Sequence, residues 1–547
     1  MDLTVSPSEF PRSLDYPEAP VGSLLVGAAR RFGDRTAFAH GDDSLSFTDT
    51  YRAACRFANA LRADGIGHGD VVAIHLPNCL AYPVAYYGTL LAGATFSPAN
   101  PLLPPDDLAF QLADCGAVAI VTFGPLSQSV DVVRDRTSVR RVIVVSPTSE
   151  DQPSFDAFLD GQPETRPDVP IDPYRDLAHL SYTGGTTGRS KGVRLPHRNV
   201  VVNTLQCAAL QTGSLPAVDE DGNPTLDQVG DPDEWPTRLG AGVAINLTPW
   251  FHAMGTIGGL NIPVLTGVSI HLHDRFDPPA YCADAERLRV HTIAGAPALF
   301  AALLTCPDFH TRDLSSVQVL SSGAAPLPHE MIKALQKRLP GVPIAEGYGL
   351  TEVTMGGVIS PPYRSGLRKV GSVGVPLFDT EVKVVAAEGG EEPLPPNTEG
   401  EVCLRGPQVM AGYLNRPEET AAALVDGWLH TGDIGVLDDD GYLSIVDRKK
   451  DMLLYKGYNV YPRELEELLI AHPAVTAAAV VGRPRADVGE LPVAFVVKAT
   501  DTTAEEILAD INAKVLPYKR IRELKFVDEI PVSAAGKILK RELRQQL

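Results

Sequence analysis

The sequence predicts an α/β fold with a large N-terminal domain of parallel sheets flanked by helices, ending in a β-rich part, and a small, mobile α+β C-terminal domain. Short apolar runs alternate with helical stretches through the first half of the 547 residues, which is typical of parallel sheets covered by helices. From 374 to 446 the pattern tightens to short strands, and a charged run precedes a last mixed segment. We therefore expect an N-terminal domain over 1–446, a hinge over 447–451 and a C-terminal domain over 452–547.

The elements of the N-terminal domain follow from short apolar runs. Residues 71–76 form such a run before Pro77 and Asn78 and predict a buried strand. Residues 83–92 then have helical character, and the proline at 83 is compatible with a helix because proline is tolerated in a first helical turn. Ligands of parallel sheets bind beyond the carboxyl ends of the strands, so strand exits are the expected binding loops. Further strands are expected at 94–97, 117–123, 142–145 and 177–182, and strand exits at 293–297, 317–326 and 346–352.

The β-rich part and the C-terminal domain are predicted in the same way. Residues 401–405 and 441–446 are the clearest strands of the β-rich part. The stretch 213–236 is rich in Asp, Gly and Pro, and it predicts an exposed, disordered loop that can be shortened without cost. In the C-terminal domain we expect a helix at 462–470, strands at 477–481 and 493–497, a helix at 504–516 and a strand at 523–527.

Composition and charge narrow the class of protein. A hydrophobic content of 44% and a charged content of 21% are ordinary for a globular protein, and a net charge of −20 disfavours non-specific nucleic-acid binding. Seven scattered cysteines without a C-x-x-C pair favour free thiols in a reducing compartment over zinc or disulfides. With no signal-peptide pattern, membrane-length apolar run or peroxisomal address, we expect a cytoplasmic protein. The sequence does not fix the oligomeric state, and a homodimer is one of the states left open.

The most informative segment is the run S-Y-T-G-G-T-T-G-R-S-K-G at 181–192. Its glycines let successive backbone N–H groups turn toward one concavity, and its threonine hydroxyls add further donors. Arg189 and Lys191 add positive charge, so the run suits a polyphosphate. It is not the Walker A pattern, because Lys191 is followed by Gly192 rather than by Ser or Thr.

Seven segments together resemble the adenylate-forming (ANL) superfamily, which includes acyl-CoA synthetases, peptide-synthetase adenylation domains and beetle luciferases. The resemblance covers the chain from about residue 21 to 543. Within the superfamily, the chain is similar to acyl-CoA synthetases of the 4-coumarate–CoA ligase kind. One such motif alone would be weak evidence for the family, whereas seven motifs in the family's order are specific evidence. The segments are 182–192, P-W-F-H at 249–252, 322–326, Y-G-L-T-E at 348–352, W-L-H-T-G-D at 428–433, D-R-K-K-D at 447–451 and G-K at 536–537.

The resemblance implies a two-step reaction. A carboxylate attacks the α-phosphorus of ATP to give an acyl-adenylate and pyrophosphate, and the thiol of CoA then takes the acyl group. Both steps concentrate negative charge, so positioned positive groups and Mg²⁺ are needed. The implied ATP and AMP contacts are Thr183, Gly184, Gly185, Thr186, Thr187, Gly188, Lys191, Gly323, Ala324, Ala325, Glu346, Gly347, Tyr348, Gly349, Asp433 and Arg448.

Within this set the resemblance gives particular roles. Thr351 contacts the α-phosphate, Glu352 and Thr183 hold Mg²⁺, Tyr348 stacks on adenine, and Asp433 accepts from the ribose hydroxyls. Lys537 matches the lysine that bridges carboxylate and α-phosphate in the first step only. For the second step the small domain rotates about Lys450, and the loop of Lys456, Gly457 and Tyr458 lines the pantetheine tunnel of CoA.

The acyl pocket is expected around His252, an aromatic gate. Amino-acid-activating relatives place an aspartate just after this gate, but here Ala253 follows. An unpaired buried ammonium is costly, so an apolar carboxylic acid is favoured, whether aryl, fatty or polycyclic. Gly184, Ser190 and Leu454 depart from the family pattern and leave open an enzyme of one half-reaction, a carrier-protein thiol as acceptor, or, less favoured, a luciferase or a non-catalytic nucleotide-binding protein. The expected acyl contacts are His252, Met254, Gly255, Gly323, Gly347, Gly349 and Met355.

Overall fold

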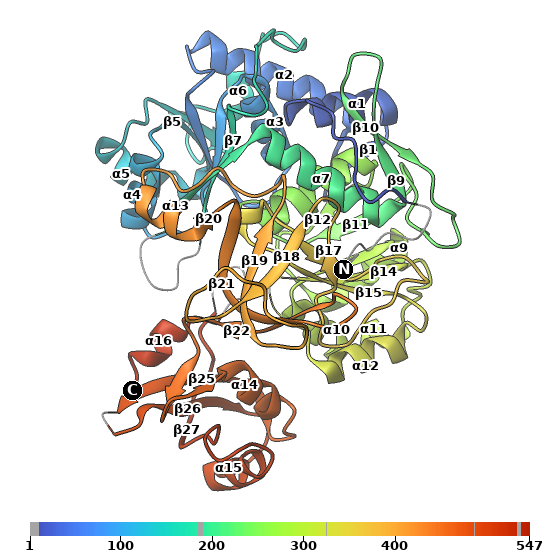
Figure 1. Ribbon diagram of the computed structural model, residues 1–547. Helices are drawn as coiled ribbons and strands as arrows, with labels where there is room; N and C mark the ends of the chain where they lie inside the picture. The colour runs from blue at the N-terminus through green and yellow to red at the C-terminus, as the bar shows by residue number, and fades with distance from the viewer. Residues whose placement is uncertain (1–9, 184–189, 324, 326, 486, 533–537) are drawn as a thin grey trace.

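The computed structural model spans 547 residues and describes all of them except 1–9, 184–189, 324, 326, 486 and 533–537. Figure 1 shows a large body built by the first four fifths of the chain and a smaller lobe, drawn in red, below it. The predicted α/β fold class, with its β-rich part and separate C-terminal lobe, is confirmed. Among the helices of the described ranges, none has the length and apolar character to cross a membrane.

The first sheet of the large body has six strands in the order β6-β5-β3-β4-β7-β8. All neighbours are parallel except β7 and β8, which form the antiparallel arms on either side of the glycine-rich run. The apolar runs of the sequence become its strands, and two of them, 117–123 and 177–182, have the predicted bounds. The strands are β3 (Val71–His75), β4 (Thr95–Pro98), β5 (Ala117–Phe123), β6 (Arg141–Val145), β7 (Leu177–Tyr182) and β8 (Gly192–Pro196).

The second sheet has nine strands in the order β17-β16-β15-β14-β13-β11-β12-β1-β2. From β15 to β1 all pairs are parallel, so the carboxyl ends of β13, β14 and β15 meet at one edge, as the strand-exit pattern predicts. The strands are β1 (Thr36–His40), β2 (Asp43–Ser46), β11 (Val243–Asn246), β12 (Ser269–Leu272), β13 (Thr292–Gly295), β14 (Val319–Ser322), β15 (Ile344–Tyr348), β16 (Val358–Ile359) and β17 (Val375–Pro376).

Helices cover these sheets, and the described apolar residues between them form three separate core clusters. Most of the helices are held by apolar faces; Tyr82, Tyr86 and Tyr87 of α3 are fully buried. The helices are α1 (Gly22–Phe32), α2 (Phe47–Ala63), α3 (Ala81–Leu91), α4 (Pro105–Asp114), α5 (Ser127–Val133), α6 (Phe155–Leu159), α7 (His197–Thr212), α8 (Ile262–Thr266), α9 (Pro278–Arg287), α10 (Pro297–Thr305), α11 (Pro307–Thr311) and α12 (His329–Arg338).

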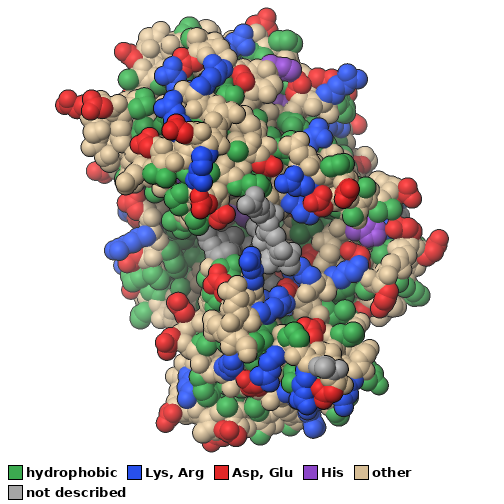
Figure 2. All heavy atoms as spheres, turned by 90° about the vertical axis from the view of Figure 1, so that its left-hand side faces the viewer, with side chains coloured by type: hydrophobic (Ala, Val, Ile, Leu, Met, Phe, Trp, Pro, Cys, Tyr) green, Lys and Arg blue, Asp and Glu red, His purple; other side chains and the backbone are tan. Residues whose placement is uncertain are grey.

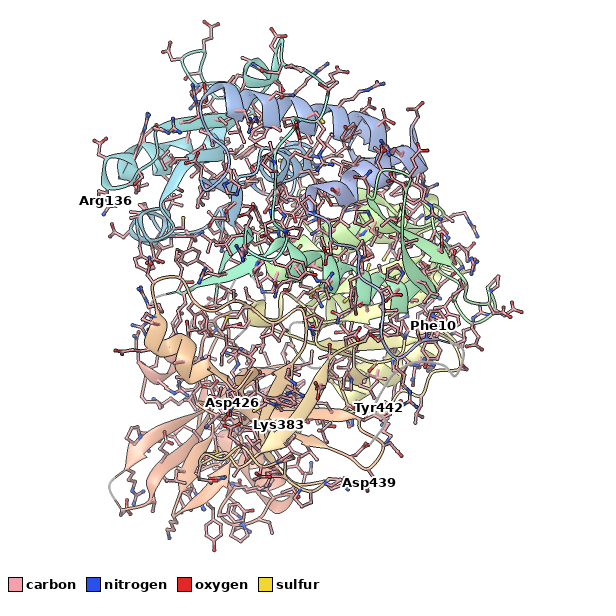
Figure 3. All side chains as sticks on the ribbon, turned by 45° about the horizontal axis from the view of Figure 1, so that its top comes forward. Phe10, Arg136, Lys383, Asp426, Asp439 and Tyr442 are labelled. Atoms are coloured by element: carbon pink, nitrogen blue, oxygen red, sulfur yellow. The ribbon has the colours of Figure 1, made fainter. Side chains whose placement is uncertain are left out.

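A third, antiparallel sheet forms the β-rich part and carries the chain to the small lobe. Its order is β18-β19-β21-β20, with β22 paired to β21. Lys383, labelled in Figure 3, lies on this sheet with its ammonium over the ring of Trp428. The elements are β18 (Glu381–Val385), β19 (Gly400–Arg405), α13 (Pro417–Ala423), β20 (Leu424–Val425), β21 (Trp428–Leu437) and β22 (Leu443–Arg448).

The C-terminal lobe has its own sheet and its own apolar core. The predicted helix at 462–470 and the predicted strands are found, and the second predicted helix ends at Ala513 instead of 516. Figure 2 shows basic side chains gathered on the lower part of the molecule, over this lobe. The elements are β23 (Leu453–Tyr455), β24 (Tyr458–Val460), α14 (Pro462–Ile470), β25 (Val475–Arg485), β26 (Gly489–Lys498), α15 (Ala504–Ala513), β27 (Glu523–Phe526) and α16 (Lys540–Arg544).

The prediction of an exposed, disordered loop at 213–236 is wrong. The segment forms a hairpin of β9 (Ser214–Val218) and β10 (Pro224–Gln228), and Leu226 and Trp235 are buried. The Trp235 indole N–H donates to the Leu210 carbonyl at 3.0 Å. Composition suggested a loop because the tight turns need Asp, Gly and Pro, whereas the few apolar residues that anchor the hairpin carry its stability.

Candidate active site

A cavity of about 1440 Å³ lies between the large body and the C-terminal lobe. Its walls come from the carboxyl ends of β7, β14 and β15, from a π-helix at Met254–Asn261, and from the junction after β22. Residues of α14, β25 and α16 close it from the lobe. The strand exits predicted from the sequence therefore converge on one space.

At one end of the cavity lie the two described arms of the glycine-rich run. The Thr183 N–H donates to the Lys191 carbonyl at 3.1 Å, and the Ser190 hydroxyl donates to the Thr183 carbonyl. Thr183 and Lys191 both line the cavity. The predicted phosphate contacts Gly184, Gly185, Thr186, Thr187 and Gly188 lie outside the described residues.

Thr351 and Glu352 line the cavity beside this run, on a single 3-10 turn at Thr351–Val353 that follows β15. The turn is fixed by backbone packing: a Cβ on Gly349 would lie 1.6 Å from the Met355 carbonyl oxygen. The Glu352 carboxylate accepts a hydrogen bond from the Tyr413 hydroxyl at 2.8 Å. Glycine at 349 is thus required for this close approach of two backbone segments.

The end of the cavity that is expected to hold the nucleoside contains Asp433, which is buried on β21. The Tyr348 hydroxyl donates to Asp433 Oδ2 at 2.6 Å, and Arg448 Nε lies 3.7 Å from Asp433 Oδ1. Burial, and then the neighbouring carboxylate, raise the pKa of Tyr348 well above its usual range, so its hydroxyl stays protonated and a donor. Asp433 and Arg448 face each other across the β21–β22 pair, which brings the two predicted nucleotide contacts together.

Other predicted nucleotide contacts border this end. Gly323 and Ala325 line the cavity after β14, and Ala324 lies outside the described residues. The Glu346 carboxylate accepts the Leu327 N–H at 3.0 Å, and burial raises its pKa. Glu346 therefore orders the loop after β14.

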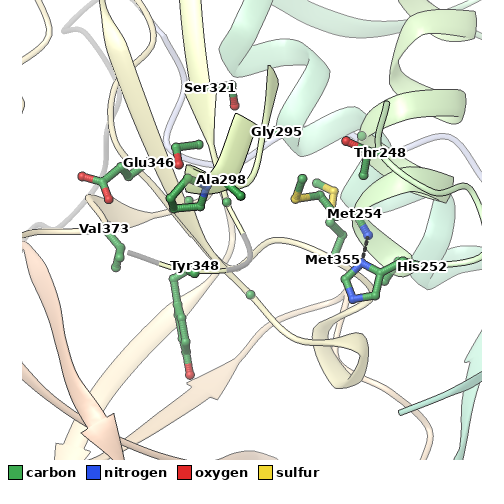
Figure 4. A pocket seen from close by; sticks show the side chains of 18 of the residues that line it. Thr248, His252, Met254, Gly295, Ala298, Ser321, Glu346, Tyr348, Met355 and Val373 are labelled. Atoms are coloured by element: carbon green, nitrogen blue, oxygen red, sulfur yellow. Dashed lines mark hydrogen bonds between the residues drawn. The ribbon is translucent and has the colours of Figure 1, made fainter. Parts of the chain in front are cut away.

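The end of the cavity that is expected to hold the acyl group lies against the π-helix. The Met254 N–H donates to His252 Nδ1 at 3.3 Å, which orients the imidazole at the cavity wall (Figure 4). The Met254 sulfur lies only 2.9 Å from where a Cβ of Gly323 would be, so glycine leaves the thioether its space. Met355 enters the pocket near the same side in Figure 4.

Gly255 was also expected to contact the acyl group, but it is not among the residues that line the cavity. It is buried, and a Cβ at this residue would lie 1.9 Å from the Pro249 carbonyl oxygen, so no larger residue fits. Its role in this structure is to allow close packing of the π-helix on the preceding turn. Gly347 and Gly349 do line the cavity, as predicted. π-Helices are rare and occur mostly at functional sites.

The residues assigned to the two half-reactions are placed differently. Lys537 lies outside the described residues, but Val532 and Ile538 on either side of it pair and line the cavity. Lys450 also lines it. Lys456, Gly457 and Tyr458 sit at the β23–β24 turn and do not belong to the described lining; Tyr458 is 57% exposed and stacks on Tyr518.

Two functional candidates escaped the sequence analysis. Tyr413 touches both Glu352 and Lys191, whose ammonium lies 4.7 Å from its ring centroid. Glu401 accepts the Gly432 N–H at 3.1 Å and the Lys449 ammonium at 2.8 Å, so it holds the turn before Asp433 against the hinge segment. A tyrosine in a turn and an acidic residue in an apolar strand give no local signal, because their partners are distant in the chain.

The donor set at the cavity bears on a metal ion. Among the described residues no cluster of three or more His, Cys, Asp or Glu side chains could hold one. Glu352 and Thr183, whose side chains carry hard oxygen donors, both line the cavity. Such a pair fits Mg²⁺, which keeps waters and takes one or two protein oxygens together with substrate phosphates.

Comparison with known proteins agrees with this arrangement. Residues 25–414 match the family model "AMP-binding enzyme", and 464–537 match its C-terminal domain. The chain is 34% identical to a long-chain-fatty-acid–CoA ligase of Bacillus subtilis (100% of this chain, 97% of the relative) and 38% identical to 4-coumarate–CoA ligase 2 of Oryza sativa (98% and 91%).

Solved structures of CoA ligases and related enzymes have the same fold as this chain. The anthranilate CoA ligase AuaEII in complex with anthranoyl-AMP superposes with a TM-score of 0.85 at 26% identity, covering 98% of each chain. ATP-bound MatB from Rhodopseudomonas palustris superposes with a TM-score of 0.83 at 27% identity, covering 96% of this chain and 99% of that one. The chain belongs to the AMP-binding enzymes of the adenylate-forming superfamily.

Proposed function

We propose that this protein is an ATP-dependent acyl-CoA synthetase that activates an apolar carboxylic acid as its acyl-adenylate and passes the acyl group to CoA. The predicted enzyme class, an acid–thiol ligase, is confirmed by the CoA-ligase relatives. The observation that carries the proposal is a single cavity in which a nucleoside end at Asp433, an anion-binding middle at Lys191 and an acyl end at the π-helix are continuous.

In the first step the chain's own groups position the reactants. Tyr348 and the Asp433 carboxylate form the adenosine end, and Lys191 supplies positive charge for the phosphates. Mg²⁺, bound by Glu352 and Thr183, would supply charge neutralisation at the phosphates. Lys537 bridges the carboxylate and the α-phosphate; the cavity lining by Val532 and Ile538, which flank it, supports this role.

The second step requires another placement of the C-terminal lobe. The Lys456–Tyr458 turn, assigned to CoA, does not belong to the described lining in this arrangement, whereas the segment around Lys537 borders the cavity. We infer that the structure corresponds to the adenylating arrangement and that rotation about Lys450, between domains 1–446 and 452–547, brings the CoA turn in. Hinges of this kind absorb large backbone changes at a few residues.

The acyl end favours an apolar acid. Ala253 and Met254 follow His252, so neither residue directly after the gate supplies a carboxylate that would pair with a substrate ammonium. The relatives named for long-chain fatty acids, 4-coumarate and ferulate act on acids of this apolar kind. Activity on only one half-reaction, or transfer to a carrier-protein thiol, are the alternatives that the assay must separate.

The test is a panel of aryl, fatty, polycyclic and amino acids incubated with ATP, Mg²⁺ and CoA, with acyl-AMP and acyl-CoA quantified by mass spectrometry. We expect both products from at least one apolar acid and neither from free amino acids. Acyl-AMP without acyl-CoA would identify an enzyme of the first half-reaction. Absence of both products with every acid, in protein that binds ATP, would refute the proposal.

A further inference from the structure

The segment Val409–Leu414 joins two parts of the site that are far apart in the chain. It runs antiparallel to β8: the Arg194 N–H donates to the Gly412 carbonyl at 3.0 Å, and the Leu414 N–H donates to the Gly192 carbonyl at 2.8 Å. At its other end the Met410 N–H donates to the Glu352 carbonyl at 2.8 Å. The exit of the glycine-rich run and the Glu352 turn are therefore held at a fixed spacing by this segment.

Tyr413 is the side chain that this segment places between the two. Its hydroxyl donates to Glu352 Oε1 at 2.8 Å, and its ring carries the Lys191 ammonium 4.7 Å from the centroid. All three side chains line the cavity.

The consequence of this arrangement is electrostatic. An ammonium and a carboxylate on neighbouring walls of a partly desolvated cavity attract each other strongly, yet the ion pairs between described residues do not include Lys191 with Glu352. The tyrosine gives each group a different contact: its ring face holds the cation, and its hydroxyl holds the anion. Neither charge has to be released from the other before a nucleotide or an ion binds.

We propose that Tyr413 is a positioning residue that keeps the Lys191 ammonium and the Glu352 carboxylate apart, so that the first remains directed at nucleotide phosphates and the second at the divalent cation. This inference rests on the proposed function, because it assumes that ATP with Mg²⁺ binds in the cavity. It assigns to Tyr413 two separable contacts, and two substitutions separate them.

Tyr413→Phe removes only the hydroxyl, so Glu352 loses its orientation while the ring still carries Lys191. We expect ATP affinity without added metal to stay near wild type, and the gain in ATP affinity caused by Mg²⁺ to fall roughly tenfold, the scale of a lost hydrogen bond to a charged group. Tyr413→Leu also removes the ring. We expect Lys191 and Glu352 then to pair, so that metal-free ATP affinity falls roughly tenfold as well.

A matched control exists in the same chain. Tyr442 carries the Lys369 ammonium 4.6 Å from its ring centroid, and its hydroxyl donates to the Leu367 carbonyl at 2.8 Å, but it does not line the cavity. Figure 3 shows it on the β-rich part. Tyr442→Phe should therefore change neither ATP affinity nor the Mg²⁺ gain.

The measurement is the dissociation constant of ATP by titration calorimetry, in EDTA and in excess Mg²⁺, for the wild type and the three variants. A Mg²⁺ gain in Tyr413→Phe equal to that of the wild type overturns the proposal, as does an equal loss in Tyr442→Phe. If Tyr413→Leu does not fold, the isosteric Phe variant still decides. Wild-type protein that binds no ATP would instead refute the proposed function.

Discussion

Gly349→Ala tests whether the Thr351–Glu352 turn is held as rigidly as its packing implies. The added Cβ would lie 1.6 Å from the Met355 carbonyl oxygen and 2.9 Å from Gly356 Cα, and these are backbone atoms that cannot rotate away. Contacts of a real Cβ stay above 3.0 Å, so the two segments must separate by about 1.4 Å. Misplacement of catalytic groups by about 1 Å can cost on the order of 10²-fold in rate.

We therefore expect the adenylation rate of Gly349→Ala, measured by ATP–pyrophosphate exchange with the best acid of the panel, to fall about 10²-fold. Overpacking should also lower the free energy of unfolding by about 1–3 kcal/mol. The matched control is Gly347→Ala, two residues away, where the new Cβ would meet Ile359 Cγ1 at 3.5 Å and the Val358 carbonyl oxygen at 3.8 Å, both ordinary contact distances.

That control should stay folded and keep most of its exchange rate. If Gly349→Ala exchanges at the wild-type rate, the turn yields without displacing Glu352, and the argument from rigid packing fails. If both alanine variants are equally slow, the loss comes from the added methyl in the cavity and not from the contact with Met355.

Three further outcomes are expected. Trp235→Ala should lower the free energy of unfolding in urea by about 3–5 kcal/mol, because a buried anchor of the β9–β10 hairpin is lost; a change below about 1 kcal/mol would restore the loop interpretation. Burial lowers the pKa of His197 to about 4, whereas the same group in the unfolded chain has a pKa of about 6.5. The neutral imidazole therefore stabilises the folded state fully above pH 6.5, and this stabilisation is lost as the pH falls toward 4. His197→Asn, which can still accept the Val21 N–H, should flatten that decline in urea unfolding midpoints, and an unchanged slope would exclude this residue as its source. Lys537→Ala should abolish acyl-AMP formation but spare acyl-CoA formation from supplied acyl-AMP, and an equal loss of both steps would contradict a role confined to the first.

Much of the fold could be predicted because its strands are buried on both faces. The runs at 117–123 and 177–182 are largely apolar and end at Gly or at the threonine-glycine run, so their bounds are local properties of the sequence. The hairpin at 213–236 could not be predicted in this way. Its stability depends on α1, where a Cβ on Gly27 would lie 2.6 Å from the Pro224 carbonyl oxygen, a contact across nearly two hundred residues.

The residues of the candidate site also divide into those that the sequence identifies and those that only distant contacts define. Motif residues such as Asp433 and Arg448 were identified because a resemblance carries their spacing, and the structure brings them together across one strand pair. Tyr413 was not identified, since its two partners come from segments 222 and 61 positions earlier in the chain and nothing local distinguishes it from a core aromatic residue. Residues that arrange others, rather than touching a ligand themselves, are defined by tertiary contacts.

The π-helix at Met254–Asn261 ties the shape of one cavity wall to the number of residues in the helix. Each of its hydrogen-bonded rings encloses one residue more than an α-turn, as the Ile262 N–H bonded to the Ile257 carbonyl illustrates. Deleting one residue before Gly258 would shift the helical register by one residue, a rotation of about 100°, and would turn Gly258 and Gly259 away from the cavity that they line. If this wall binds the acyl group as proposed, a single-codon insertion or deletion here would reshape the pocket in a way that no substitution scan would sample.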